Sequence, residues 1–238
     1  MAVENGEWVL HGADWDSPER EGGIRKILQQ EGRIPEQEDH GPLWGEEYRQ
    51  NKGEQTMKIT SIALDLDGTT LNSRGVLSER TRQAIEKALG RDICVIPASG
   101  RSFDSLPEEI LHIPGIRYAI TSNGARVDDV RGHCLFCQEI YPDTALSLLS
   151  DCQTLRIGVS AHIRREYLLQ GRLLQMMGKA VYGKDAEQAR CVPDLRPLIK
   201  QSRGVEELQF YFFSRTAREA LRQILSYYPT LNAAYSSS

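Results

Sequence analysis

Two aspartates, Asp65 and Asp67, close an apolar run, and a glycine and two threonines follow at 68–70. Ligand sites in parallel α/β sheets form beyond the carboxyl ends of the strands, so a carboxylate placed there would stand in a crevice. One such carboxylate can attack phosphorus as a nucleophile. A neighbouring acid can protonate the leaving oxygen and then activate water. The glycine permits a sharp turn and close approach of backbone amides to an anion, and Thr69 adds a hydroxyl donor.

The alternative for this stretch is an Asx-type turn that ends a strand without any chemistry. A bare Asp-x-Asp would favour that alternative. Here a buried strand precedes Asp-Leu-Asp-Gly-Thr-Thr, and every element has a role in phosphoryl transfer, so we favour the chemical interpretation.

The residues around the aspartates predict the elements that must position them. The pattern predicts strands at 58–66, 92–99 and 117–121, and helices at 78–90 and 105–113. Strand and helix alternate over about 65 residues, which indicates a parallel α/β sheet. Ser78 is the predicted N-cap of the first helix, and Ser105 with Glu108 has the spacing of a capping box.

After Asn123 the rhythm changes to hairpins mixed with helices, which indicates a separate α+β module. The predicted strands are 125–129, 134–140, 156–163, 166–170, 205–213 and 230–237, and the predicted helices are 142–152, 172–180 and 216–228.

The bulk composition is that of a soluble globular protein: 238 residues, 40% hydrophobic and 26% charged. No apolar run reaches the roughly 18 residues of a membrane span. The first residues lack the basic start and apolar core of a signal peptide. Five cysteines at irregular spacing argue against a disulfide framework, so we expect a cytoplasmic protein. Basic residues are not clustered with aromatics, so we expect no nucleic-acid partner.

Residues 1–56 differ from the rest of the chain. They carry 13 of the 33 acidic and 6 of the 29 basic residues, a net charge of −7. The remaining 20 acidic and 23 basic residues give a net charge of +3. We expect 1–56 to be an acidic, poorly ordered extension. Its Asp14-Trp15-Asp16 imitates the later aspartate pair, but no strand precedes it, so we interpret it as a solvated loop.

Three segments in order resemble a known family. Asp65–Leu71 looks like motif I of the haloacid dehalogenase-like (HAD) phosphohydrolases. Ile96–Arg101 is similar to motif II, in the "TGR" form of the Cof-type branch. Thr121–Ala125 resembles the "NGA" segment of that branch. The resemblance covers 57–238.

The resemblance implies a Rossmann-like core at 57–125 carrying motifs I and II, with an inserted α+β (type C2) cap at 126–238. It implies a Mg²⁺-dependent phosphatase that acts on small phosphorylated metabolites, such as sugar phosphates, through an aspartyl phosphate. Asp65 would be the nucleophile and Asp67 the general acid/base. The Asp65 carboxylate and the Asp67 backbone carbonyl would bind Mg²⁺. The implied phosphate- and substrate-binding residues are Thr69, Ser99, Gly100, Arg101 and Asn123.

The chain departs from the family pattern after the cap, where a lysine and a Gly-Asp-x-x-x-Asp motif are expected. Lys200 is followed by Gln-Ser-Arg-Gly, and Gly183-Lys184-Asp185 is not that motif. We therefore expect a core sheet incomplete at its C-terminal end, with the edge of its first strand bare. Two unit charges about 4 Å apart interact by about 4 kcal/mol at an effective dielectric of 20. A phosphate facing Asp65 therefore needs cations, and two ligands alone would hold Mg²⁺ weakly.

This departure leaves alternatives open. The second hypothesis is a truncated, non-catalytic product that at most binds a phosphorylated ligand or a partner. A phosphomutase would use the same chemistry, but an α+β cap after motif II favours the hydrolase. The sequence leaves the oligomeric state open.

Weaker signals have structural explanations. Cys134 and Cys137 form a Cys-x-x-Cys, but zinc would need a second pair, and on a strand the two side chains point to opposite faces. We interpret both cysteines as structural. His112, His133 and His162 have no partner pattern and are expected at surface or core positions.

Overall fold

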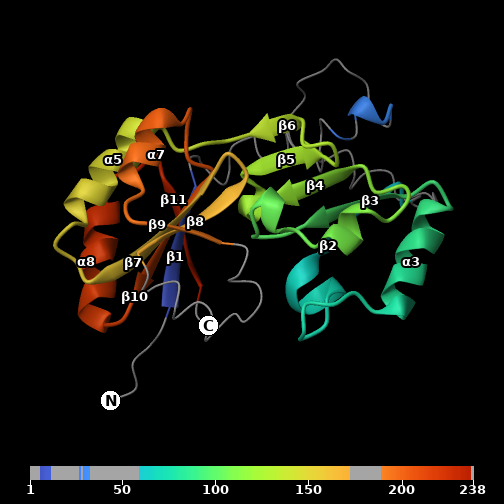
Figure 1. The fold of residues 1–238 in the computed structure, drawn as a ribbon, viewed down its shortest axis with the longest axis horizontal. Helices are drawn as coiled ribbons and strands as arrows, with labels where there is room; N and C mark the ends of the chain where they lie inside the picture. Colours follow the sequence, from blue (N-terminus) through green and yellow to red (C-terminus); the bar gives the residue numbers. More distant parts are fainter. Residues whose placement is uncertain (1–5, 12–26, 28, 33–58, 172–188, 237–238) are drawn as a thin grey trace, which may run out of the picture. The chain divides into compact units, whose positions relative to one another are not determined.

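The computed structural model describes residues 6–11, 27, 29–32, 59–171 and 189–236 (Figure 1). The chain divides into two compact units. The core unit comprises 16–100 and 106–136, and the cap unit comprises 1–15, 101–105 and 137–238. The predicted fold class, an α/β core with an α+β cap, is confirmed by the sheets of the two units.

The core unit is built on a five-stranded sheet of order β2-β3-β4-β5-β6. The strands are β2 (Ser61–Asp65), β3 (Cys94–Ala98), β4 (Tyr118–Thr121), β5 (Arg126–Asp129) and β6 (Cys134–Cys137). β2, β3 and β4 run parallel, and β5 is antiparallel to β4. β2 stands at one edge of this order, so among the described residues one of its edges has no partner strand.

The expected boundary between core and cap at 125/126 differs from the observed division. β5 and β6 belong to the core sheet, and the division lies between Phe136 and Cys137. The reason is backbone pairing: β5 turns back along β4 with Thr121 opposite Arg126 and Tyr118 opposite Asp129. A hairpin pattern in the sequence does not say which sheet the hairpin joins.

The first predicted helix is confirmed, whereas the predicted capping box is wrong. α3 (Glu79–Leu89) begins after Ser78, whose hydroxyl accepts a hydrogen bond from the Thr81 amide (3.1 Å). α4 (Glu108–Leu111) begins only after Pro107, and the Ser105 hydroxyl pairs with that of Ser102 instead (2.9 Å). Proline disfavours the helical conformation at the residue before it, so a helix start at position 106 is unfavourable.

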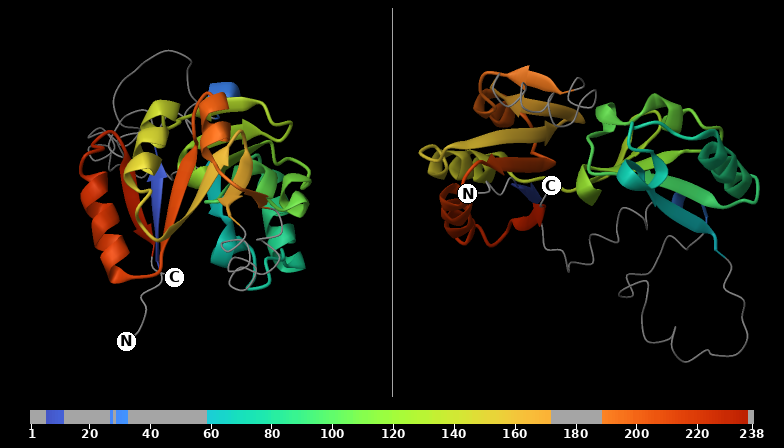
Figure 2. Two further views of the ribbon diagram at one scale, coloured as in Figure 1. Left: turned by 60° about the vertical axis from the view of Figure 1, so that its left-hand side comes forward. Right: turned by 90° about the horizontal axis from the view of Figure 1, so that it is seen from below.

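The cap unit is built on a six-stranded sheet of order β11-β1-β10-β7-β8-β9. The strands are β1 (Gly6–His11), β7 (Ile157–Ile163), β8 (Glu166–Gln170), β9 (Arg190–Val192), β10 (Glu207–Phe212) and β11 (Asn232–Ser236). Helices α5 (Pro142–Asp151), α7 (Arg196–Gln201) and α8 (Arg215–Leu225) cover one face of this sheet (Figures 1 and 2). The predicted helix at 172–180 lies outside the described residues, and the sequence did not predict β9 or α7.

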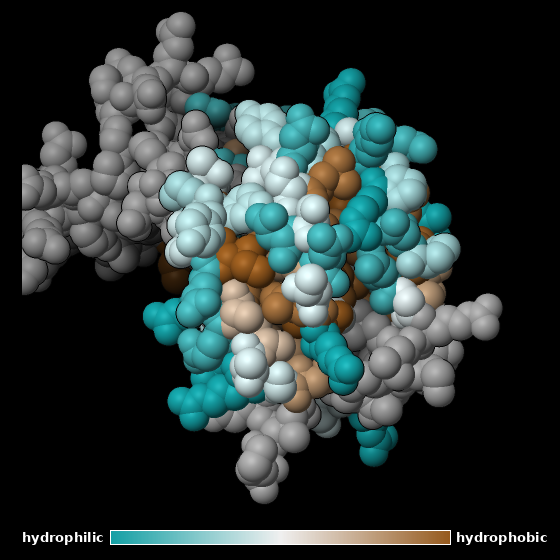
Figure 3. Space-filling view, turned by 90° about the vertical axis from the view of Figure 1, so that its left-hand side faces the viewer, coloured by the Kyte–Doolittle hydropathy of each residue, from teal (hydrophilic) through white to brown (hydrophobic). Residues whose placement is uncertain are grey.

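The cap helices are amphipathic. Buried Leu148, Ile199 and Leu221, one from each helix, pack into one cluster with Ala161 and Phe210 of the sheet. Figure 3 shows the face over α5 and α8, where hydrophilic side chains cover most of the described surface and apolar ones gather in its middle. Among the described helices, none has the length and apolar character needed to cross a membrane.

Part of the N-terminal extension has a defined place, contrary to the expectation of poor order. β1 lies between β10 and β11 and is antiparallel to both, with Leu10 opposite Leu208 and Ala233. Leu10 is 0% exposed within the cap cluster. In the core unit, Ile27 is buried against Ile96. Burial of these residues depends on partners remote in the sequence, which local patterns cannot reveal.

Glu31, also in the extension, bonds to the core sheet. The Tyr118 hydroxyl donates a hydrogen bond to the Glu31 carboxylate (2.8 Å), and Arg117 pairs with the same carboxylate. Burial, followed by this hydrogen bond, raises the pKa of Tyr118 to about 12. Neutral Tyr118 is therefore part of the folded core unit at ordinary pH.

We expect Leu10→Ala to lower the free energy of unfolding by about 2–5 kcal/mol, because it opens a cavity in the cap core. Val76→Ala, at a side chain 48% exposed, is the control and should change it by no more than about 0.5 kcal/mol. Denaturant unfolding monitored by circular dichroism measures both. Equal, small effects of the two substitutions would show that residues 6–11 lie outside the sheet.

We expect Glu31→Gln to move the pKa of Tyr118 down from about 12, while burial keeps it above the ordinary value of about 10. Because the pKa of Tyr118 is higher in the folded than in the unfolded chain, this residue stabilises the fold below pH of about 10. The stabilisation is lost as the pH rises to about 12. Ultraviolet titration of the phenolates measures the shift, with Tyr118→Phe identifying the signal. Burial and a hydrogen bond to Asp151 raise the pKa of Tyr228 to about 12, and this pKa should not change in Glu31→Gln. An unmoved Tyr118 midpoint would contradict the Glu31 contact.

Candidate active site

The carboxyl ends of three parallel strands converge on the candidate site. The pairing of β2 with β3 sets Asp65 opposite Ala98, so Ser99 follows directly at the same edge. The Ser99 amide donates to the Ile120 carbonyl (3.0 Å), and the Asn123 amide donates to the Ser99 carbonyl (3.3 Å). The loops that follow β3 and β4 are thus joined through Ser99.

The loop after β2 wraps around Asp65. Gly68 has φ +76°, a left-handed conformation that glycine adopts without strain. The turn brings Thr70 back to the Asp65 carbonyl (2.6 Å) and the Thr69 hydroxyl to the Asp65 carboxylate (2.7 Å). Thr69, predicted to bind phosphate, here orients the nucleophile candidate. Thr70 was not among the predicted site residues, although its motif position could have indicated it.

Asp67 and Ser99 lie next to each other across the site. The Ser99 hydroxyl donates to the Asp67 carboxylate (3.3 Å). Ser99 is 7% exposed, whereas the side chains of Asp65 and Asp67 both face solvent. The arrangement therefore presents two accessible carboxylates beside a hydroxyl whose position is set by the sheet.

Gly100 is required by the close approach of Asn123. A Cβ at position 100 would lie 2.9 Å from Asn123 Oδ1 and 3.1 Å from Nδ2. Asn123 itself has φ +51° and follows Ser122 at φ +49°. Two successive non-glycine residues in the left-handed region are costly and persist where their surroundings hold them. The Asn123 side chain is thus held against the backbone of the Ser99 loop.

The structure brings six of the seven predicted site residues into the core unit. These are Asp65, Asp67, Thr69, Ser99, Gly100 and Asn123. Arg101 belongs to the cap unit, where its guanidinium donates to the Ser105 carbonyl (3.3 Å). At the end of β4 the structure adds Thr121, which is fully buried and whose hydroxyl has no hydrogen-bond partner among the described residues.

The donor set at the site consists of oxygens. The Asp65 carboxylate and the Asp67 carbonyl are the hard ligands that Mg²⁺ prefers. Among the described residues, neither aspartate belongs to a cluster of three or more histidine, cysteine or acidic side chains that could hold a metal ion. The described residues therefore fit Mg²⁺ in kind, while supplying fewer ligands than its octahedral shell requires.

Comparison with known proteins decides the family. Residues 62–221 match the haloacid dehalogenase-like hydrolases along about two thirds of the chain. The chain belongs to this family. The recognition made from the three ordered motifs is therefore confirmed, and HMP-PP phosphatases among its relatives support the Cof-type branch.

Curated relatives of this HAD-like chain are bacterial phosphatases. A putative phosphatase of Buchnera aphidicola is 32% identical over 38% of this chain and 34% of its own length. A 5-amino-6-(5-phospho-D-ribitylamino)uracil phosphatase of Bacillus subtilis is 31% identical over 32% and 30%. An HMP-PP phosphatase of Cronobacter sakazakii is 30% identical over 37% and 32%. The matched segment spans about a third of the length of each relative.

Solved HAD structures share the fold. A Thermotoga maritima protein superposes with a TM-score of 0.56 at 24% identity, covering 72% of this chain and 62% of that one. A HAD-superfamily phosphatase of Bacteroides thetaiotaomicron superposes with a TM-score of 0.55 at 18% identity, covering 73% and 63%. At these identities the likeness concerns the fold alone.

We expect Gly100→Ala to destabilise the core unit by about 1–3 kcal/mol, because the added methyl overpacks against Asn123. Asn123→Gly should recover most of that loss in the double variant, since glycine removes the side chain and suits a positive φ. Thermal unfolding of the two single variants and the double variant measures this coupling. Purely additive effects would show that the two side chains do not meet.

Proposed function

We propose that this chain carries the phosphoryl-transfer site of a Mg²⁺-dependent phosphatase that acts on a small phosphorylated metabolite. The observation that supports this most directly is the arrangement at the end of β2. Thr69 holds the Asp65 carboxylate in an accessible position (2.7 Å), and the Ser99 hydroxyl reaches Asp67 (3.3 Å). The relatives include phosphatases that act on phosphorylated small molecules.

In the first half-reaction an Asp65 oxygen attacks phosphorus and the bond from phosphorus to the leaving oxygen breaks. Asp67, in its protonated form, transfers its proton to that oxygen. The Ser99 hydroxyl turns from Asp67 to a phosphoryl oxygen. The product of this step is an aspartyl phosphate on Asp65.

In the second half-reaction Asp67, now a carboxylate, takes a proton from water. The water oxygen attacks phosphorus and the bond from phosphorus to Asp65 breaks. Inorganic phosphate is released, and the Asp65 carboxylate is regenerated. Asp67 thus serves as acid and then as base, because it faces the same side of phosphorus in both steps.

Charge decides how fast these steps run. A phosphate oxygen about 4 Å from Asp65 is repelled by about 4 kcal/mol at an effective dielectric of 20. Mg²⁺, when held by the Asp65 carboxylate and the Asp67 carbonyl, supplies positive charge that offsets this repulsion. Thr69 keeps the attacking carboxylate oriented during the approach.

Binding without turnover is the second candidate function. It is favoured by the two-ligand donor set among the described residues, which would hold Mg²⁺ weakly. In that case the Ser99 loop and the backbone amides around Gly68 would bind a phosphoryl group that the chain does not cleave.

For either candidate we propose a reducing cytoplasm as the location, on the basis of the cysteines. All five cysteines are free thiols in the structure. Folded proteins of oxidising compartments are commonly held by disulfides, and this chain uses none.

We expect Asp65→Asn to lower Mg²⁺-dependent hydrolysis by at least roughly 10³-fold, because an amide cannot form the acyl phosphate. The matched control is Asp92→Asn, at an exposed turn of the same unit with φ +60°, which asparagine also tolerates. Phosphate release from HMP-PP and from sugar phosphates measures turnover, and mass spectrometry detects the phosphorylated aspartate.

Unchanged turnover in Asp65→Asn would overturn the assignment. A wild-type chain that binds vanadate without hydrolysing any phosphate, and loses that binding in Ser99→Ala, would establish the second candidate. The two candidates are therefore separated by one set of proteins.

A further inference from the structure

A short antiparallel bridge in the cap unit brings three potential metal-ligating residues together. The Ile140 amide donates to the Val205 carbonyl (2.7 Å), and the Val205 amide donates back to the Ile140 carbonyl (3.0 Å). Glu139 is the residue before Ile140, and Glu206 is the residue after Val205. Antiparallel neighbours one step from a doubly bonded pair face each other closely. Cys137 lies two residues before Glu139 and so shares its side of the extended chain.

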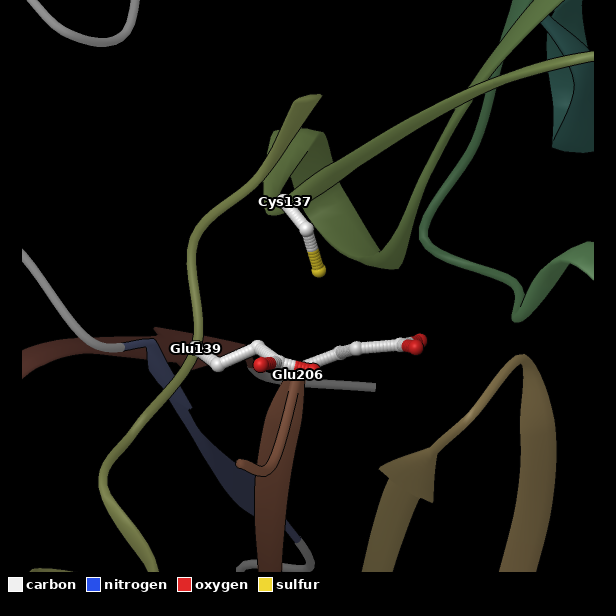
Figure 4. Close-up of side chains that lie close together, drawn as sticks. All are labelled: Cys137, Glu139 and Glu206. Carbon is white, nitrogen blue, oxygen red and sulfur yellow. The ribbon is translucent and has the colours of Figure 1, made fainter. Parts of the chain in front are cut away.

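The geometry points to a divalent transition-metal site formed by Cys137, Glu139 and Glu206, and we propose that it binds zinc. One ligand atom from each residue lies within 4.8 Å of the other two. Figure 4 shows the Cys137 sulfur directed toward the two glutamates. Bond lengths of about 2.0–2.3 Å around zinc place its ligand atoms roughly 3–4 Å apart, so small side-chain rotations complete the site.

Charge and burial give the reason for a cation here. Like charges directly opposite each other across strands destabilise the pairing. Glu206 is 0% exposed, while Cys137 and Glu139 are half-buried, so water screens this repulsion incompletely. A divalent cation between the carboxylates turns the repulsion into two attractions. It also draws the Cys137 thiol into its deprotonated, ligating form.

The surrounding backbone is shaped to hold these side chains in place. A Cβ at Gly204 would lie 2.5 Å from the Glu139 Cβ and 2.8 Å from its Oε2. Only glycine therefore lets the Glu139 side chain lie along the segment that carries Glu206. The Arg165 amide donates to Glu206 Oε1 (3.0 Å) and orients that carboxylate, as outer-shell groups do at metal sites.

The ligand set selects the metal. One thiolate and two carboxylates suit zinc in four-coordination, with water as the fourth ligand. Mg²⁺ takes oxygen ligands in octahedral geometry and does not favour sulfur. The site is therefore chemically distinct from the Mg²⁺ ligands of the proposed phosphatase, and it shares no residue with them.

Zinc binding by the full chain tests the proposal. The purified protein is stripped with a chelator, kept reduced, and titrated with Zn²⁺ against a chromophoric competitor. Co²⁺ serves as a spectroscopic probe, because a thiolate ligand gives a charge-transfer band. The matched controls are Cys134→Ser, on the same strand, and Glu166→Gln, in the same unit with a half-exposed side chain.

We expect one Zn²⁺ per chain, not displaced by excess Mg²⁺. Cys137→Ser and Glu139→Gln should each weaken binding by more than the roughly tenfold that follows loss of an outer-shell partner. Gly204→Ala should weaken it as well, whereas both control variants and Asp65→Asn should bind as the wild type does. The Co²⁺ charge-transfer band should vanish in Cys137→Ser and persist in Cys134→Ser.

Absence of Zn²⁺ binding by the folded chain would overturn the proposal. Binding that survives Cys137→Ser would also overturn it, as adventitious binding elsewhere. Glu206→Gln is interpreted only where circular dichroism shows a native fold. If that variant does not fold, Cys137→Ser and Glu139→Gln, at half-buried positions, decide the outcome.

Discussion

The two backbone hydrogen bonds of Ser99 hold the candidate active site together. Its amide is bonded to the Ile120 carbonyl and its carbonyl to the Asn123 amide, so the ends of β3 and β4 cannot separate without breaking both. Buried backbone groups must be paired, which makes this junction costly to open. Parallel pairing of β2 with β3 then sets Asp65 one residue away from the junction. The carboxylates, the hydroxyl and the asparagine meet because three strands end together.

The strands that lead to the candidate site could be predicted because their signals are local. An apolar strand that ends on Asp65, and a second that ends at Ser99, are visible without knowledge of their partners. The Ser78 cap was predictable for the same reason. The predictions were wrong where an adjacent proline or a partner distant in the sequence determines the local structure. Pro107 disfavours the helix start that the spacing of Ser105 and Glu108 predicted. The place of Leu10 depends on Leu208 and Ala233, which no local pattern connects to it.

Glycines show the same division between local and distant causes. Gly68 is needed for its own backbone conformation, and its place in a turn motif reveals that need. Gly100 and Gly204 are needed because another side chain lies against them: Asn123 in one case and Glu139 in the other. Such a requirement follows from the tertiary structure, so it becomes apparent only when the contacting residue is known. The metal site proposed at Cys137 has a cause of the same kind, since Glu206 comes near Cys137 through the bridge at Ile140. The interpretation of Cys134 and Cys137 as structural stays a prediction.

Two acidic pairs, Asp65 with Asp67 and Glu139 with Glu206, differ in their exposure to solvent. Asp65 and Asp67 face water, which screens their charges from each other. Glu206 is removed from water and faces Glu139 across a tight backbone pair, so its charge must be compensated within the resting fold. A resident cation belongs to the second situation, and a cation that accompanies substrate belongs to the first. The same residue chemistry is thus proposed for catalysis where it is solvated and for metal binding where it is buried.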